Sequence, residues 1–244
     1  MLLKDKVAII TGAASGIGKA IAELFSVEGA TVIVADLTQE AGEEVVKSIT
    51  SKGGVAKFIQ VDVSNEAQVN RLVEETINEF GKIDIMYNNA GIAMPLSNIE
   101  EVDEALYEKM MSINMKGVFL GTKAVAPYMK KAGKGVILST ASTAAVRPRA
   151  GLNIYSASKG AVVAFSKSVA LELAPYGIRV NCINPSATNT PMLEEEHLKV
   201  FIKTMPLGKI AEPLDIAQAA LFLASDYASM VTGVDFNVDG GRSV

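Results

Sequence analysis

The chain has 244 residues, of which 49% are apolar and 20% are charged, with a formal net charge of -4. A chain of this length and composition buries a full hydrophobic core, so we expect one α/β domain over residues 1–244. The charges of both signs are interspersed, which argues against nucleic acid and membrane surfaces as partners. The expected partners are small molecules or further copies of the chain.

Short runs rich in valine and isoleucine alternate with longer segments of helical period. This alternation is typical of a parallel sheet covered by helices on both faces. We predict strands at 7–11, 31–36, 55–61, 83–88, 135–140, 178–184 and 234–238, and helices at 17–28, 39–52, 66–80, 101–130, 154–175 and 213–225. The helix over 101–130 is expected to break near Gly117. The predicted fold class is a doubly wound α/β sheet of about seven strands.

Two further features concern location and assembly. Residues 1–10 carry charges and lead into a strand, without the apolar segment and cleavage site of a secretory signal. The single cysteine, Cys182, lies in an apolar strand and is expected to be a buried, inert thiol, which fits a cytoplasmic protein. The helix over 154–175 and the run 118–125 leave little polar surface, so we expect a homo-oligomer.

A glycine-rich turn follows the first predicted strand. Glycines at a strand-to-helix turn let a phosphate approach backbone N–H groups at the start of the helix. The expected cofactor-binding residues of this turn are Gly12, Ser15, Gly16, Ile17 and Gly18. The pattern predicts a Rossmann-type dinucleotide site.

Asp36 ends the second predicted strand, where a carboxylate can bind the adenosine ribose hydroxyls. A 2'-phosphate at about 4 Å from it would face a repulsion of roughly 1 to 4 kcal/mol. Leu37 follows it, and no basic residue is placed to receive that phosphate. The sequence therefore favours NAD over NADP, although a strand-end aspartate can also be a plain turn former.

Two more loops follow strands at the same edge of the predicted sheet. Asp62 and Val63 are placed to contact the adenine, and the run Asn89, Ala90 and Gly91 is placed beside the ribose. The alternative is that both are ordinary loops, because asparagine and glycine are common turn residues.

Tyr155 and Lys159 are four residues apart in a predicted helix and so share one face. A fixed cation favours the phenolate, and moving a tyrosine pKa from about 10 to near 7 takes about 4 kcal/mol. The pattern predicts a proton-transfer pair, with a surface tyrosine and lysine as the alternative.

These motifs occur in the order found in the short-chain dehydrogenase/reductase family, which the chain resembles over essentially its whole length. The fragments that carry the resemblance are the glycine turn, Asn88 to Gly91, Tyr155 to Lys159, Asn184-Pro185 followed by Thr190, Pro206 to Gly208, Phe222 to Asp226, Thr232-Gly233 and Val238 to Gly241. The resemblance implies a tetramer as the favoured assembly, and no metal.

The resemblance also implies roles for four residues. Tyr155 would be the general acid and base, and Lys159 would lower its pKa and bind the nicotinamide ribose. Ser142 would hold the substrate oxygen, with Ser139 and Thr143 as alternatives left open by the spacing. Asn114 would order a water near Lys159, or else be a structural residue that interrupts a helix.

Around the sixth strand the resemblance implies further cofactor contacts. Pro185, Thr188 and Thr190 would lie by the nicotinamide. The family commonly has glycine where this chain has Ser186, so the geometry of this loop is open.

A substrate lid is expected near residues 187–210. Apolar residues predict a site for a secondary alcohol or ketone, namely Met94, Val146, Leu152 and Met192. Arg147 and Arg149 are either anchors for an anion or solvated loop residues, and His197 is expected to be an exposed lid residue.

Two other functions remain as alternatives. The C-terminal third also resembles 3-oxoacyl-thioester reductases of the carrier-protein type, against which Asp36 argues because that group usually takes NADPH. A non-catalytic NAD-binding sensor would be expected to lack some of the four catalytic positions, and all four are present.

Overall fold

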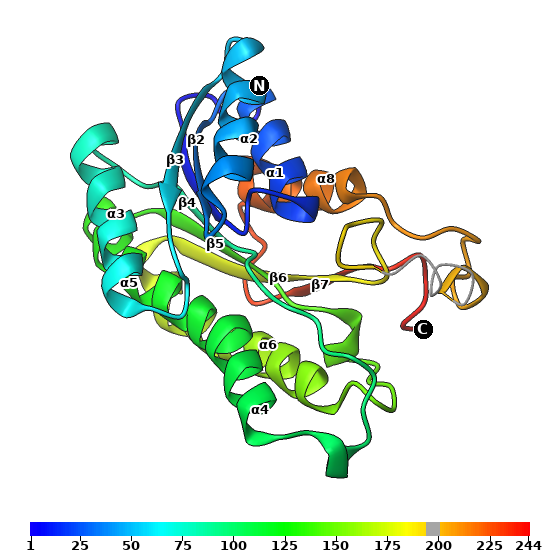
Figure 1. Ribbon diagram of the computed structural model, residues 1–244. Helices are drawn as coiled ribbons and strands as arrows, with labels where there is room; N and C mark the ends of the chain where they lie inside the picture. Colours follow the sequence, from blue (N-terminus) through cyan, green and yellow to red (C-terminus); the bar gives the residue numbers. More distant parts are fainter. Residues whose placement is uncertain (194–200) are drawn as a thin grey trace.

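The computed structural model describes residues 1–193 and 201–244. Its centre is a parallel sheet of seven strands in the order β3-β2-β1-β4-β5-β6-β7 (Figure 1). The strands are β1 Val7–Thr11, β2 Thr31–Asp36, β3 Val55–Gln60, β4 Ile85–Asn88, β5 Gly135–Thr140, β6 Ile178–Pro185 and β7 Asp235–Val238. The strand order changes direction between β1 and β4, which makes this the switch point of a doubly wound sheet. The predicted fold class is confirmed.

The helices connect these strands. They are α1 Gly16–Val27, α2 Gln39–Ser51, α3 Glu66–Phe80, α4 Glu104–Met111, α5 Gly117–Ala132, α6 Asn153–Leu173 and α8 Pro213–Ala224. The long helix expected over 101–130 is two α-helices joined by a π-helical turn at Ser112–Lys116, so the expected break near Gly117 is confirmed. Its position suits glycine, because a Cβ on Gly117 would lie 2.9 Å from the side chain of Val63.

Most boundaries lie within one or two residues of the prediction, and the start of the fourth strand shows a physical reason for a difference. Strand β4 begins at Ile85 rather than at residue 83. The carboxylate of Asp84 is buried, and it accepts a 2.9 Å hydrogen bond from the backbone N–H of Val7. This side-chain bond satisfies a backbone donor at the start of β1, so regular pairing of the two strands begins one residue later.

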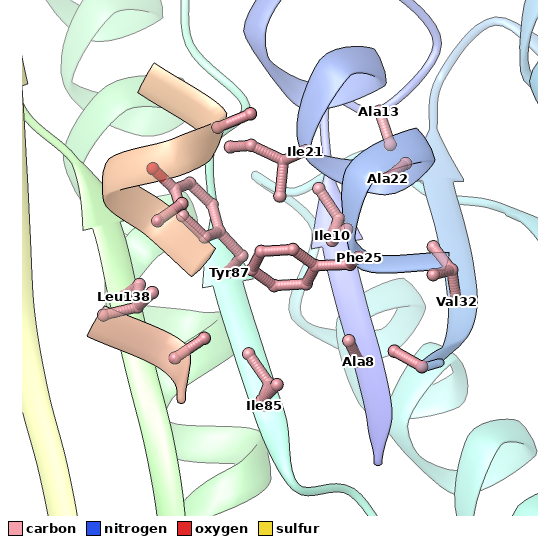
Figure 2. Packing of buried hydrophobic residues seen from close by; sticks show 14 of the residues in the cluster. Ala8, Ile10, Ala13, Ile21, Ala22, Phe25, Val32, Ile85, Tyr87 and Leu138 are labelled. Atoms are coloured by element: carbon pink, nitrogen blue, oxygen red, sulfur yellow. The ribbon is translucent and has the colours of Figure 1, made fainter. Parts of the chain in front are cut away.

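Successive side chains of the central strands enter two separate cores, since a strand points its residues alternately to either face. Ala8 and Ile10 pack with α1, α2 and α8, whereas Ile9 packs with α3, α5 and α6. Figure 2 shows the first core, where Phe25 of α1 lies beside Tyr87 of β4. Each such side chain that is fully buried contributes about 1.5 to 3 kcal/mol to folding. Packing in the two cores stabilises both faces of the sheet, and the loops lie at the carboxyl ends of its strands.

The C-terminal segment returns to these loops. In Figure 1 it lies beside the segment that follows β6, and the backbone N–H of Leu207 donates a 3.2 Å hydrogen bond to the carbonyl oxygen of Gly240. Within the described residues, no helix has both the length and the apolar character needed to cross a membrane. Nor does this part of the chain hold a group of three or more metal-binding side chains.

Candidate active site

A large cleft runs along the carboxyl ends of the strands, with a volume of about 920 Å³. Ligands of open α/β sheets bind at this edge, next to the switch point. Among the residues expected to bind cofactor, those lining the cleft are Gly12, Ser15, Gly16, Ile17, Asp36, Leu37, Asp62, Val63, Asn89, Ala90, Gly91, Tyr155, Lys159, Pro185, Thr188 and Thr190. Residues far apart in the sequence therefore meet in one cleft.

The glycine turn is packed too closely for side chains. A Cβ on Gly12 would lie 2.8 Å from the Cα of Ala90, and this glycine has φ +63°. A Cβ on Gly18 would overlap the carbonyl oxygen of Gly12. Gly18 is buried and is not among the cleft-lining residues, so it acts by packing the helix against the turn.

Asn89 ties this turn to its neighbours. Its side-chain amide donates to the carbonyl oxygens of Thr11 and Gly12 at 3.1 and 3.2 Å, and its oxygen accepts from the hydroxyl of Thr140 at 3.0 Å. The three strands β1, β4 and β5 are thereby held in fixed relation at their carboxyl ends. The glycine turn consequently has a rigid support.

The carboxylate of Asp36 faces the same turn. One oxygen accepts a 2.9 Å hydrogen bond from the N–H of Ala14, and the other accepts a 3.0 Å bond from the N–H of Thr38. Because each carboxylate oxygen has two lone pairs, both keep capacity for hydroxyl donors. Asp36 is thus oriented before any ligand binds.

Asp62 belongs to the next loop. One of its carboxylate oxygens accepts from the backbone N–H of Ser64 at 2.9 Å and from the hydroxyl of Ser64 at 2.7 Å.

The glycine turn also approaches the loop after β6. A Cβ on Gly16 would lie 3.2 Å from the methyl of Thr190. The glycine turn and the loop after β6 are therefore in contact range.

Tyr155 and Ser142 line the same cleft. Burial raises the pKa of the Tyr155 phenol, while the neighbouring hydroxyl of Ser142 acts in the opposite direction. Contrary to the expectation, Lys159 is not among the groups that lower this pKa, because its ammonium lies 6.0 Å from the centre of the tyrosine ring.

Lys159 is only 4% exposed. Its ammonium donates a 2.8 Å hydrogen bond to the carbonyl oxygen of Thr140 at the end of β5. Burial lowers the pKa of Lys159 to about 8, so its charge is partly lost just above neutral pH. An ammonium has three donors, and two remain for other partners.

Asn114 lies in the π-helical turn, is fully buried and is not among the cleft-lining residues. Its amide oxygen accepts from the N–H of Ile92 at 2.8 Å, and its amide nitrogen donates to the carbonyl oxygen of Ile92 at 3.0 Å and to Ser158 Oγ at 3.2 Å. The side chain thus joins the loop after β4 to helix α6, one residue before Lys159.

The expected substrate residues divide into two groups. Ser142, Met94, Leu152 and Met192 line the cleft. Val146 was wrongly expected there, because it follows the short helix Thr143–Ala145, is 44% exposed and is not among the lining residues. Of the two alternatives to Ser142, Thr143 lines the cleft, whereas Ser139 is buried outside it with its hydroxyl unpartnered.

Three other expectations concern single residues. Cys182 is buried, as predicted, and burial raises the pKa of its thiol to about 11. His197 lies outside the described residues, as does the middle of the expected lid. The hydroxyl of Ser186 accepts a 3.3 Å hydrogen bond from the guanidinium of Arg242. Arg242 and Phe201 also line the cleft, and neither was predicted because neither belongs to a recognisable motif.

Comparison with known proteins agrees with this geometry. A family model described as enoyl-(acyl carrier protein) reductase matches residues 12–243. The 2,5-dichloro-2,5-cyclohexadiene-1,4-diol dehydrogenase LinX of Sphingobium indicum is 43% identical over 99% of this chain and 98% of its own length. The chain belongs to the short-chain dehydrogenase/reductase family.

Other members of the family are similar over their full lengths. Cyclopentanol dehydrogenase of Comamonas testosteroni is 38% identical over 98% of this chain and 97% of its own. The crystal structure of a 3-ketoacyl-(acyl-carrier-protein) reductase from Brucella melitensis, complexed with NADH, has a TM-score of 0.96 and 43% identity, and the match covers 99% and 100% of the two chains. The protein is therefore a short-chain oxidoreductase that acts on CH–OH groups with a nicotinamide cofactor.

Proposed function

We propose that the protein interconverts a secondary alcohol and its ketone with NAD(H), using Tyr155 as general acid and base. The observation that carries this proposal is that Tyr155, Ser142 and Lys159 line the same cleft as the glycine turn and Asp36. The cleft fits a dinucleotide because its glycines leave backbone room where a Cβ on Gly12 would meet Ala90. When bound, the nicotinamide supplies the chemistry of hydride transfer.

The chain itself orients the substrate and moves the proton. In oxidation, the phenolate of Tyr155 takes the proton of the substrate hydroxyl as the carbon loses its hydride, and in reduction the phenol returns it. Ser142 would make a second contact to the same substrate oxygen, because its hydroxyl lies beside the Tyr155 phenol and lines the same cleft. Lys159 has free donors for the nicotinamide ribose, since only one is used by Thr140.

Asn114 acts through other residues in this proposal. Its side chain is occupied by Ile92 and Ser158, so it positions the loop after β4 and the start of α6. The expected water near Lys159 would then be held by the backbone of the π-helical turn. Turns of this type occur frequently at functional sites, because they expose backbone groups that a regular α-helix uses internally.

A preference for NAD rests on Asp36. Its carboxylate is already oriented by two backbone N–H groups and lines the cleft, where a 2'-phosphate would be repelled. The NADH in the Brucella melitensis reductase is in line with this preference.

Assembly as a homo-oligomer, with a tetramer favoured, is proposed from the surface of α5 and α6. Phe119 and Leu171 are 40% and 81% exposed, and Phe119 packs edge to face on Phe165 at 6.1 Å. Apolar surface of this kind is common at subunit interfaces. A cytoplasmic location remains a prediction, as do the single domain over 1–244 and the lid near 187–210.

The substrate class is proposed from the apolar residues Met94, Leu152 and Met192 of the cleft, together with the alcohol dehydrogenases among the relatives. Reduction of 3-oxoacyl thioesters is the second candidate, favoured by the similarity to the Brucella melitensis reductase. A panel of secondary alcohols and ketones, assayed with NAD(H) and NADP(H) by nicotinamide absorbance, distinguishes them. Turnover of acetoacetyl thioesters with strong NADPH preference, and none of simple alcohols, would refute the first proposal.

A further inference from the structure

Three arginines gather at one part of the cleft. The guanidinium carbons of Arg149 and Arg242 lie 5.4 and 5.0 Å from the centre of the same ring, that of Phe201. The guanidinium of Arg147 donates a hydrogen bond to the backbone carbonyl oxygen of Arg242. All four residues line the cleft that also contains Tyr155. A substrate bound at Tyr155 thus shares its cleft with three positive charges.

Arg242 is held in place by its surroundings. Its guanidinium donates to the hydroxyl of Ser186 at 3.3 Å, and Ser186 itself follows β6. The carboxylate of Asp239 is engaged by the backbone N–H groups of Gly241 and Ser243 at 3.0 and 2.9 Å. The hydroxyl of Ser186 therefore helps to hold the Arg242 guanidinium in the cleft.

The three positive charges act on one another. Burial lowers the pKa of Arg242, the charges of Arg149 and Arg147 lower it further, and the charge of Asp239 offsets part of this shift. Within residues 1–193 and 201–244, none of the three guanidinium groups forms an ion pair with a carboxylate. Like charges in a half-buried place are unfavourable, and a bound anion would relieve that repulsion.

The shape of the charged groups limits the anion. A guanidinium is planar and binds a carboxylate through two parallel hydrogen bonds, which are stronger than hydrogen bonds between neutral groups. The same cleft is lined by Met94 and Leu152, which suit an apolar body. The cleft therefore offers an anion contact, an apolar section and a proton-transfer group in one space.

We propose that the substrate is a secondary alcohol or ketone with a compact apolar body and a carboxylate, which Arg149 and Arg242 bind while Ser186 positions Arg242. This inference rests on the proposed function and narrows it. Arg147 contributes by fixing the C-terminal segment and by adding positive charge.

A matched pair of substrates tests the proposal. The carboxylate is 4-(1-hydroxyethyl)benzoate, and the neutral control of nearly the same shape is 4-(1-hydroxyethyl)benzamide. For the unaltered protein we expect kcat/KM to be about 10- to 100-fold higher for the carboxylate, mainly through a lower KM, as one charge-assisted contact implies. In Arg149→Gln and Arg242→Gln the ratio should fall toward one. Arg71→Gln, on the exposed surface of α3, is the matched control and should keep the ratio.

Ser186→Ala tests the positioning role. It should raise KM for the carboxylate severalfold with little change in kcat, and Ser186→Thr should restore the lower KM because it keeps the hydroxyl. An equal effect of Ser186→Ala on both substrates would assign Ser186 a merely structural role in the loop and overturn this part of the proposal.

The remaining outcomes are also decisive. If the panel alcohols are oxidised but kcat/KM for the carboxylate is no higher than for the amide, this inference fails and the proposed function stands. If no alcohol is oxidised, the proposed function itself fails. The sequence has glutamates at 194–196, outside the described residues, and a ratio unchanged in the arginine variants would overturn the inference in favour of such partners. A larger effect of these variants on acetoacetyl-CoA than on acetoacetyl-N-acetylcysteamine, with no effect on the benzoate, would assign the arginines to the phosphates of coenzyme A.

Discussion

The ammonium of Lys159 donates a hydrogen bond to the carbonyl oxygen of Thr140, at 2.8 Å, and lies 6.0 Å from the ring centre of Tyr155. The lysine is thus anchored to the end of β5. It has the depressed pKa of a buried cation, while the tyrosine has the raised pKa of a buried phenol. Burial therefore shifts both groups toward their neutral forms.

The buried charge of Lys159 should make stability depend on pH. Its pKa is about 8 in the folded protein and 10.5 in the unfolded chain, so the unfolded state binds more protons between these values and the free energy of unfolding rises with pH. The penalty is fully present below pH 8 and amounts to about 3 kcal/mol. Lys159→Met should therefore be more stable than the unaltered protein at pH 7, and this advantage should shrink toward pH 10.

Urea unfolding at several pH values between 7 and 10 measures this difference. Cys182, whose pKa is raised to about 11, interacts with Lys159, so both proteins are compared with Cys182→Ala in place and the titration of the thiol does not enter the difference. The exposed Lys19→Met is the control and should give a constant difference. A constant difference for Lys159→Met as well would contradict the buried charge.

Tyr155→Phe should lower kcat for alcohol oxidation by roughly 10² to 10⁴. It removes the group that takes the proton but keeps the ring, so NADH binding, measured by its fluorescence, should change little. In the unaltered protein the oxidation rate should rise with pH, because only the phenolate can accept the proton, and the reduction rate should fall. Tyr107→Phe, in the exposed part of α4, is the control. Substantial turnover by Tyr155→Phe would contradict the proposed mechanism.

Asp36→Asn should reduce the preference for NAD over NADP by about tenfold or more, because it removes the charge that repels a 2'-phosphate and keeps the shape of the side chain. The ratio of kcat/KM with the two cofactors measures this change. Asp103→Asn removes a carboxylate at the N-terminus of α4 and should leave the ratio unaltered. An unchanged ratio in Asp36→Asn would refute the assigned role.

Asn114→Ala should lower the free energy of unfolding and the rate of turnover. The substitution leaves the backbone groups of Ile92 and the hydroxyl of Ser158 without their partner, and each buried group costs about 1 to 3 kcal/mol. Thermal unfolding should shift down by about 5 to 10 °C. Asn70→Ala, at an exposed position of α3, should shift it very little. A normal melting temperature in Asn114→Ala would show that these bonds are dispensable.

Gly18→Ala should impair both folding and cofactor binding. Its new methyl group would overlap the carbonyl oxygen of Gly12 and lie 2.6 Å from the amide nitrogen of Asn89, so the turn must move. We expect NADH affinity to fall by more than tenfold, measured by fluorescence titration, since the turn bears the phosphate contacts. Lys19→Ala, one residue later and exposed, is the control. Unchanged NADH affinity in Gly18→Ala would show that the turn accommodates the methyl group, and it would contradict this prediction.

Much of this arrangement was predictable because its determinants are local. Runs of β-branched residues and glycine turns are read directly from the sequence, and they gave the strands and the nucleotide end of the cleft. The pKa of Tyr155 was not predictable in the same way, because it depends on the balance between burial and the distance of one ammonium. Helical spacing supplies the shared face but neither of those quantities.

The substrate end of the cleft shows a second reason why some contacts could not be predicted from the sequence. Val146 follows Ser142 closely, yet a short helical turn between them places it in solvent. Arg242 lies far from that segment in the chain and reaches the same cleft through the path of the C-terminal segment. Contacts of this kind depend on loop geometry, which has no period and no fixed spacing for a sequence motif to reveal.

The π-helical turn at Ser112–Lys116 has a consequence for changes in chain length. A π-helical turn holds one residue more than an α-helical turn and bulges outward to accommodate it. Deletion of one residue from this turn would therefore restore a regular α-helix and keep Val118, Leu120 and Val125 on the core side, whereas Asn114 would lose its place opposite Ile92. The core would tolerate such a deletion better than the cleft, so the extra residue serves the cleft.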